Sequence, residues 1–195
     1  YLPCIGNYIY GASDKALWVN LFIGNTTEVT IDGKKVVMKQ ETDYPWDGLV
    51  KLTVTSEQPL GKELRIRIPG WCKSYTLSVN GNKVDSTTDK GYTVIKEWKT
   101  GDLIVLNMDM PVEKVSADPR VRQNTGKRAL QRGPLVYCLE ETDNAKDFAD
   151  LALTPTSSFE VKDEPDNLGG IRSIKAISNG QTLHFIPHYA WDNRK

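Results

Sequence analysis

The sequence predicts an all-β protein of two consecutive antiparallel, jelly-roll-like β-sandwich domains, and the second is expected to be smaller and truncated at its end. Apolar and polar residues alternate in several short segments, which places the apolar side chains on one face of a strand. Asn-Gly and Asp-Gly pairs, which suit tight hairpin turns, separate these segments. No window of a dozen residues carries an apolar stripe at helical spacing. Together these patterns are typical of sandwiches.

The alternation is clearest in the first half of the chain. Leu64, Ile66 and Ile68 alternate with charged residues, and the segments 50–55 and 104–110 follow the same rule. Trp71 and Cys72 follow the first of these strands, and we expect Trp71 to pack over the end of the sandwich. Type I′ turns need positive φ at both central residues, which Asn, Asp and Gly tolerate best. The predicted turns are Asp32-Gly33, Asp47-Gly48, Asn80-Gly81 and Asn179-Gly180.

The pattern changes near Pro111, which predicts a first domain over residues 1–111 and a second over 112–195. Residues 140–166 hold nine carboxylates against two lysines and few strand formers. We interpret this acidic stretch as a long surface loop. Residues 144–151 within it are the best, though weak, helical candidate.

Composition and charge exclude several classes of protein. Twenty-five Lys and Arg residues balance twenty-five Asp and Glu residues, so the basic excess of a duplex-binding protein is missing. Hydrophobic residues make up 39% of the chain, which argues against disorder. No apolar run approaches the ~18 residues of a spanning helix. The first residues do not resemble a signal peptide, and the compartment, periplasm or cytoplasm of a bacterium, stays open.

Two histidines have a spacing that could place both on one metal. His184 and His188 are four residues apart, but Pro187 interrupts the segment and no Cys or acid lies close in sequence. A metal site there is the weaker interpretation. The chain is expected to need no cofactor of its own.

The three cysteines are too few and too scattered for a disulfide framework. Cys4, Cys72 and Cys138 could each act as a nucleophile, but no base or cation stands at a specific spacing to activate the thiol. For Cys72 and Cys138, buried and unreactive thiols are the favoured interpretation.

Tryptophans offer another candidate site, because sandwich modules use exposed aromatic rings to stack on sugars. Trp18 and Trp98 sit among alternating apolar residues and are predicted to belong to the core. Trp46 lies in a loop with Tyr44 and Asp47, and these three residues are the candidates for contact with a sugar or with another domain. Packing at a turn is the favoured role of Trp46.

Several segments, in order, carry a family resemblance. The most specific are Tyr44-Pro45-Trp46-Asp47-Gly48 and the block Gln-Arg-Gly-Pro-Leu-Val-Tyr at 131–137. The chain resembles the C-terminal part of glycoside hydrolase family 127, the β-L-arabinofuranosidase-like enzymes. The full set of matching segments is 7–10, 17–24, 41–48, 67–72, 79–81, 129–138 and 186–194.

The resemblance implies that an (α/α)6 barrel precedes two β-sandwich domains and carries the catalysis. In that family a zinc-bound cysteine thiolate is the nucleophile, beside further Cys ligands and a Glu, and another Glu is the acid/base. The nucleophile belongs to a Cys-Cys-Pro-x-Asn-like motif upstream of the segment that matches Tyr8-Ile9-Tyr10. Cys4, followed by Ile5-Gly6-Asn7, does not reproduce that motif. The resemblance therefore assigns neither a catalytic residue nor the zinc to this chain.

The leading hypothesis is a non-catalytic accessory region that supports and flanks the barrel of a family 127 enzyme. The alternative is an independent carbohydrate-binding β-sandwich module, and a third hypothesis is a small β enzyme with an unrecognised site. The expected partners are the barrel and arabinose-containing glycans, with a second copy of the chain joined through the second domain. Neither nucleic acid nor a membrane is an expected partner.

Overall fold

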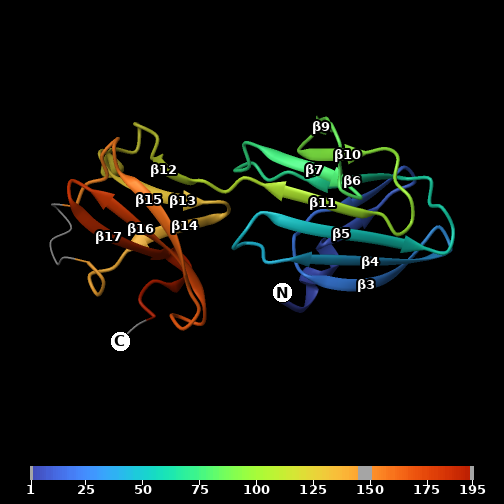
Figure 1. The fold of residues 1–195 in the computed structure, drawn as a ribbon, viewed down its shortest axis with the longest axis horizontal. Helices are drawn as coiled ribbons and strands as arrows, with labels where there is room; N and C mark the ends of the chain where they lie inside the picture. The colour runs from blue at the N-terminus through green and yellow to red at the C-terminus, as the bar shows by residue number, and fades with distance from the viewer. Residues whose placement is uncertain (1, 145–150, 194–195) are drawn as a thin grey trace. The chain divides into compact units, whose positions relative to one another are not determined.

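The computed structural model describes residues 2–144 and 151–193. Contacts along the chain divide it into a first unit, Tyr1–Met110, and a second unit, Pro111–Lys195. Apart from short 3-10 helices, the regular structure of the described residues consists of strands, so the predicted all-β class is confirmed (Figure 1). No helix among the described residues is long and apolar enough to cross a membrane.

The first unit contains two sheets, and η1 (Leu2–Tyr8) precedes them. The five-stranded sheet has the order β1 (Tyr10–Ala12), β2 (Ala16–Val19), β6 (Glu63–Arg67), β10 (Tyr92–Ile95), β9 (Thr88–Asp89). The six-stranded sheet has the order β3 (Asn25–Ile31), β4 (Lys34–Thr42), β5 (Leu49–Ser56), β11 (Leu103–Met108), β7 (Tyr75–Val79), β8 (Asn82–Lys83). One pairing departs from the antiparallel prediction, because β2 and β6 run parallel. Strands β3 to β5 form the connection between them and belong to the other sheet, so β6 can return beside β2 in the same direction.

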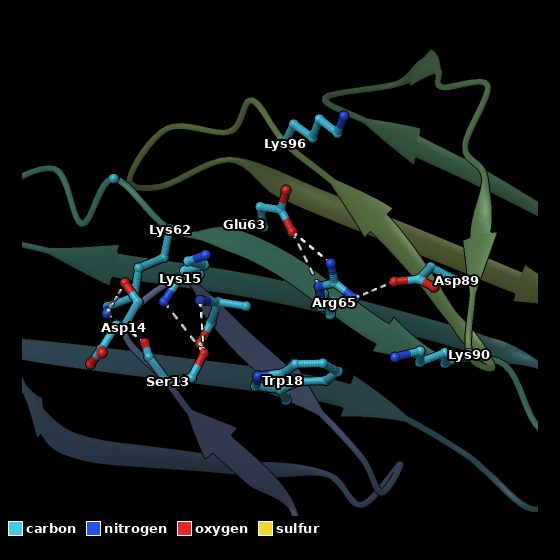
Figure 2. Close-up of a pocket in the computed structure, with 12 residues that line it drawn as sticks. Ser13, Asp14, Lys15, Trp18, Lys62, Glu63, Arg65, Asp89, Lys90 and Lys96 are labelled. Carbon is cyan, nitrogen blue, oxygen red and sulfur yellow. Dashed lines mark hydrogen bonds and ion pairs between the residues drawn. The ribbon is translucent and has the colours of Figure 1, made fainter.

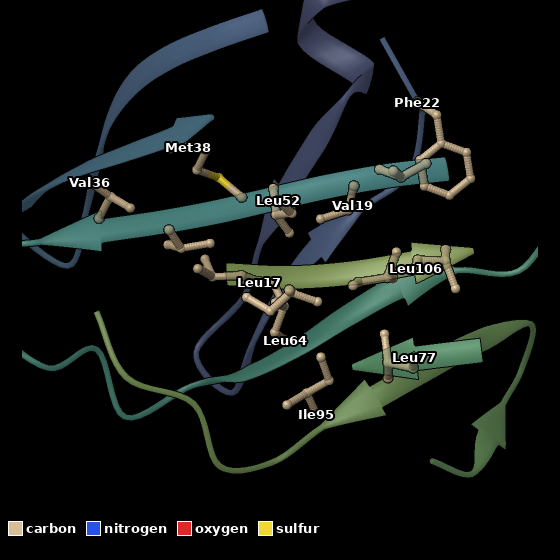
Figure 3. Packing of buried hydrophobic residues seen from close by; sticks show 14 of the residues in the cluster. Leu17, Val19, Phe22, Val36, Met38, Leu52, Leu64, Leu77, Ile95 and Leu106 are labelled. Carbon is tan, nitrogen blue, oxygen red and sulfur yellow. The ribbon is translucent and has the colours of Figure 1, made fainter. Parts of the chain in front are cut away.

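The core of the first unit lies between these two sheets, and Figure 3 shows side chains from both of them meeting. Burying an aliphatic side chain of the size of Val or Leu contributes about 2 kcal/mol to the stability of the fold. The buried members labelled there are Leu17, Val19, Phe22, Val36, Met38, Leu52, Leu64, Leu77, Ile95 and Leu106.

The two tryptophans predicted to be core differ in position. Trp98 packs against the buried cluster, and its Nε1 donates a hydrogen bond to the Lys62 carbonyl at 2.8 Å. Trp18 is only partly buried and lines a groove. The prediction for Trp18 was therefore wrong. Its neighbours Leu17 and Val19 are buried, so the pleat turns the side chain between them to the opposite face.

Three of the predicted turns have the expected backbone. In each, both the Asn or Asp and the Gly have positive φ, as type I′ turns require. These turns are Asp32-Gly33, Asn80-Gly81 and Asn179-Gly180. Asp47-Gly48 is different, because neither residue has positive φ. It ends a longer loop in which the Trp46 amide donates to the Asp43 carbonyl at 2.8 Å.

Trp71 packs against the core of the first unit, as predicted, and its ring stacks on Tyr44 with 6.4 Å between centroids. Cys72 beside it is partly buried, and this burial raises the pKa of its thiol. A smaller thiolate fraction means slower reaction with thiol reagents.

We expect Trp71→Ala to lower the free energy of unfolding by about 2 kcal/mol. This is less than for a fully buried aromatic residue, because Trp71 keeps some exposure. Urea denaturation followed by circular dichroism measures the change. An unfolding midpoint equal to that of the unmodified chain would contradict the packing role.

The second unit is built on one antiparallel sheet. Its order is β12 (Val112–Ser116), β13 (Arg128–Arg132), β14 (Leu135–Leu139), β17 (Gln181–Pro187), β16 (Ile171–Ser178), β15 (Ser158–Glu164), with η2 (Arg122–Asn124) and η4 (His188–Ala190) outside it. All strands described there join this single sheet, whereas two facing sheets were expected. Leu151 and Leu153, which are not in a strand, pack against the buried cluster around Leu130, Tyr137 and Phe185. The chain before β15 thus provides part of the cover that a second sheet would give.

The acidic stretch 140–166 was predicted to be a loop, and this is wrong for its C-terminal part. Ser158–Glu164 forms β15, which pairs along its length with β16. Its residues are mostly exposed and it lies at the edge of the sheet, where charged side chains are tolerated and limit pairing with other chains. The helical candidate 144–151 falls largely on residues 145–150, outside the described residues.

Candidate functional site

The Tyr44-to-Gly48 loop connects β4 to β5, and its aromatic residue Tyr44 is packed inward. The Tyr44 ring meets Phe22 edge-on at 5.4 Å and stacks on Trp71. Burial raises the pKa of its hydroxyl. Asp47 serves the turn, since its Oδ1 accepts a hydrogen bond from the Leu49 amide at 3.0 Å. Trp46 is partly exposed. Contact of these residues with a sugar or another domain stays a prediction.

Gly48 is the most constrained residue of this loop. A Cβ built on it would lie 1.9 Å from the Met108 carbonyl oxygen, far inside van der Waals contact. Its own carbonyl accepts a hydrogen bond from the Met108 amide at 3.0 Å. Two backbone segments therefore touch here, and only glycine leaves the room.

The two histidines do not form a metal pair. His188 stacks on Trp191 with 6.3 Å between ring centroids. His184 lies between two carboxylates, with Nδ1 3.2 Å from Asp143 Oδ2 and Nε2 2.8 Å from Glu164 Oε1. Both ring nitrogens are thus engaged by carboxylates. In residues 2–144 and 151–193 no three His, Cys, Asp or Glu side chains form a set that could hold a metal ion.

Glu164 is the charged centre of this second-unit cluster. It accepts hydrogen bonds from Ser173, from Asn167 at 2.6 Å and from His184. Burial by itself would raise the pKa of Glu164. The three hydrogen bonds and the attraction of His184 outweigh burial and hold the pKa at about 2, below its ordinary 4.5. The carboxylate thus fastens β15 to β16 and β17.

We expect Glu164 to make the stability of the second unit depend on pH. A carboxyl whose pKa is depressed by folding stabilises the fold above its ordinary pKa, and this contribution is lost as the pH falls from 4.5 through about 2. The thermal midpoint of Glu164→Gln should therefore lie below that of the unmodified chain at neutral pH, and the difference should close toward pH 2. Glu160→Gln, an exposed carboxylate on the same strand, is the control and should have little effect. A difference that is constant from neutral pH to pH 2 would refute the assignment.

A groove of about 880 Å³ lies over β2 and β6 in the first unit, and we call it the β2–β6 groove (Figure 2). Parts of the β1–β2 turn, the start of β6, the β9–β10 turn and the end of β10 line it. The lining residues are Ser13, Asp14, Lys15, Ala16, Trp18, Gly61, Lys62, Glu63, Arg65, Asp89, Lys90 and Lys96.

Trp18 and Arg65 form the centre of the groove. The Arg65 guanidinium carbon lies 5.0 Å from the centre of the Trp18 ring, a cation–π arrangement. Glu63 at 2.9 Å and Asp89 at 2.8 Å hold the guanidinium by ion pairs. Tyr92 meets the Trp18 ring edge-on at 4.8 Å. The planar pair is therefore fixed in place before any ligand arrives.

The lysines of the groove fall into two kinds. Lys62 is 2% exposed, and its ammonium is satisfied by the Ser13 and Asp14 carbonyls and by Asp32. Lys15, Lys90 and Lys96 are exposed, and their ammonium groups have no hydrogen-bond or ion-pair partner in the described part of the chain. Sequence reasoning did not find this groove. The signal available was the polar face of β6, where Glu63 and Arg65 alternate with buried residues.

Comparison with known proteins gives the family. A family model described as "Beta-L-arabinofuranosidase, GH127 middle domain" matches residues 16–110, and one described as "Glycoside hydrolase family 127 C-terminal domain" matches 112–195. The chain belongs to glycoside hydrolase family 127. The two matched regions meet where the structure divides into its two units.

Individual relatives support the assignment to family GH127. A non-reducing end β-L-arabinofuranosidase of Bifidobacterium longum subsp. longum is 32% identical over 227 positions, which cover 100% of this chain and 34% of the relative. A solved GH127 β-L-arabinofuranosidase from Geobacillus stearothermophilus T6 is 42% identical with a TM-score of 0.89, over 97% of this chain and 34% of that one. A second solved GH127 β-arabinofuranosidase is 33% identical with a TM-score of 0.90, over 100% of this chain and 35% of that one. The chain thus spans about a third of the length of these relatives.

The zinc–thiolate centre implied by the family resemblance does not fit the described residues. Cys4 lies in η1, Cys72 follows β6, Cys138 lies in β14 of the second unit, and none of the three forms a disulfide. A structural or catalytic zinc site needs three or four ligands around one point. No step of a zinc-dependent reaction is therefore assigned to this chain.

Proposed function

We propose that this chain is the non-catalytic accessory region of a β-L-arabinofuranosidase-like GH127 enzyme, where it holds and flanks a catalytic (α/α)6 barrel. The observation that carries the proposal is the match of the GH127 middle and C-terminal domain models to nearly the whole chain. About two thirds of each GH127 relative described above falls outside the region that the chain matches. The barrel is the proposed occupant of that remainder.

The chemistry of the described residues supports this role. Glycoside hydrolysis needs an activated nucleophile and a proton donor on either side of the scissile bond. The carboxylates that the structure brings together are already engaged, Glu63 and Asp89 by Arg65 and Glu164 by His184. Their charges hold strands and a guanidinium in place.

The segment before β1 supports a contact with another part of the enzyme. In η1, the side chains of Ile5 and Tyr8 are 46% and 66% exposed. Exposed apolar side chains that lie together can form a surface that another part of a protein covers. We propose that η1 joins the accessory region to the barrel and packs against it.

An activity assay tests the proposal. The chain by itself, supplied with zinc and an aryl β-L-arabinofuranoside, is expected to give no turnover. The same chain joined to the remaining part of its parent protein is expected to be active. Cys4→Ala in the joined protein should leave turnover unchanged. Turnover by the separate chain that disappears in Cys4→Ala would refute the accessory role.

A further inference from the structure

The β2–β6 groove combines an aromatic floor with unpaired cations on its rim. We propose that it binds an acidic oligosaccharide, a short chain of sugars that carry carboxylate groups. The Trp18–Arg65 pair would lie under a sugar ring, and Lys15, Lys90 and Lys96 would meet the carboxylates. The accessory role in catalysis neither requires nor predicts this binding site.

The floor of the groove has the groups that a sugar ring needs. A tryptophan ring offers an apolar face to the C–H groups of a sugar, and nearby polar groups fix its hydroxyls. Arg65 uses Nε and one N–H on each terminal nitrogen to bind Glu63 and Asp89. Because a guanidinium has five N–H groups, donors remain for a ligand. Arg65 is already immobilised, so a ligand would not have to order it.

The charge of the rim decides between a neutral and an acidic sugar. Arg65 pairs with two carboxylates, Glu63 and Asp89, which leaves one negative charge there, and Lys62 is balanced by Asp32. The three rim lysines have no carboxylate partner within the described residues, and Asp14 is the one lining carboxylate that is not engaged. Positive charge is therefore in excess around the groove, although the whole chain has a net charge of zero. Such a local excess attracts anionic ligands.

The size of the groove also fits a short oligosaccharide. Its volume of about 880 Å³ is at the upper end of the range for small-molecule sites. The rim lysines come from the β1–β2 turn, the β9–β10 turn and the segment after β10. Carboxylates on successive sugars could therefore reach different lysines while one ring lies over the Trp18–Arg65 pair.

Isothermal titration with a galacturonate oligosaccharide tests the proposal, with a neutral arabinose oligosaccharide of the same length as comparison. We expect a dissociation constant of about a millimolar or below for the acidic sugar, and binding about tenfold weaker for the neutral one. Raising the salt concentration from ~0.02 M to ~0.2 M should weaken binding of the acidic sugar. Equal affinity for both sugars, or no binding of the acidic one, would overturn the proposal.

Variants place the binding in the groove. Trp18→Ala and the triple variant Lys15→Gln, Lys90→Gln, Lys96→Gln should each weaken binding by about tenfold. Trp191→Ala and Lys51→Gln, which change an exposed tryptophan and an exposed lysine elsewhere, are the matched controls and should not. If Trp18→Ala fails to fold, the triple variant decides, because its side chains are exposed and unpartnered.

A second arm tests the rival occupant, the remaining part of the enzyme. Binding should persist when the chain is joined to that part. Binding that is lost on joining, or a triple variant with unchanged affinity, would overturn the proposal. Neither result bears on the turnover assay above, so the two hypotheses can fail independently.

Discussion

Gly48→Ala is expected to destabilise the first unit by about 3 kcal/mol or more, at the upper end of the cost of overpacking. The added methyl group would lie 1.9 Å from the Met108 carbonyl oxygen. That oxygen is backbone at the end of β11, so no rotation of a side chain relieves the clash. The loop or the strand has to move, and the hydrogen bond from the Met108 amide to Gly48 is lost with it. Chemical denaturation of the two proteins measures the difference.

Gly70→Ala is the matched control for this substitution. Gly70 also belongs to a segment that resembles the family, but a Cβ on it has no neighbour within 4 Å and its φ is not positive. We expect a change of less than about 0.5 kcal/mol, as is usual for exposed positions. If both variants were equally stable, close packing of the Gly48 backbone would not explain the glycine.

Lys62→Ala is expected to cost about 3 kcal/mol. The Lys62 ammonium is held by the Ser13 carbonyl at 2.6 Å, the Asp14 carbonyl at 3.0 Å and Asp32 Oδ2 at 2.8 Å. Truncation removes these bonds, strands two carbonyls and leaves a cavity beside the core. Because the ammonium ties the β1–β2 turn to the β3–β4 turn, hydrogen exchange at both turns should also accelerate.

Two further lysine variants show which part of the Lys62 side chain accounts for the loss of stability in Lys62→Ala. Lys35→Ala removes an ion pair with Glu28 in which both side chains are more than half exposed, so the free energy of unfolding should hardly change. Lys62→Met keeps most of the buried volume without the charge and should fall between Lys62→Ala and the unmodified chain. Equal stability of Lys62→Ala and Lys35→Ala would contradict the structural role of the buried ammonium.

The sequence predicts most strands of the first unit because one face of each is buried and the other is exposed to solvent, so apolar and polar residues alternate. Leu64 and Ile66 alternate with charged residues, so the face that carries Leu64 and Ile66 has to be the buried one. Trp18 shows the limit of this reasoning, because it lies in the apolar run Leu17-Trp18-Val19. In such an apolar run, alternation shows only that Leu17 and Val19 share one face of the strand and that Trp18 lies on the other. Which of the two faces is buried depends on the neighbouring strands, and the sequence pattern does not identify these strands.

The candidate groove depends even more on pairings that the sequence does not reveal. Lys15, Trp18, Lys90 and Lys96 come from distant segments, and none has a recognisable motif. They gather because β6 has β2 on one side and β10 on the other. The resemblance to the family predicted the parent enzyme better than the alternation of residues did. It rests on segments such as the Gly48 loop, in which close packing restricts the choice of residue.

The parallel pairing of β2 with β6 has a consequence for how the first unit forms. Residues 20–62 separate the two strands, whereas β3 pairs with β4 and β4 with β5, each the next strand in sequence. Contacts between distant segments form late and slow folding, because a long loop must close before they contribute. During synthesis the backbone of β2 would lack its partner β6 until β6 has left the ribosome. The β3–β5 meander can form first and provide the surface on which the five-stranded sheet assembles.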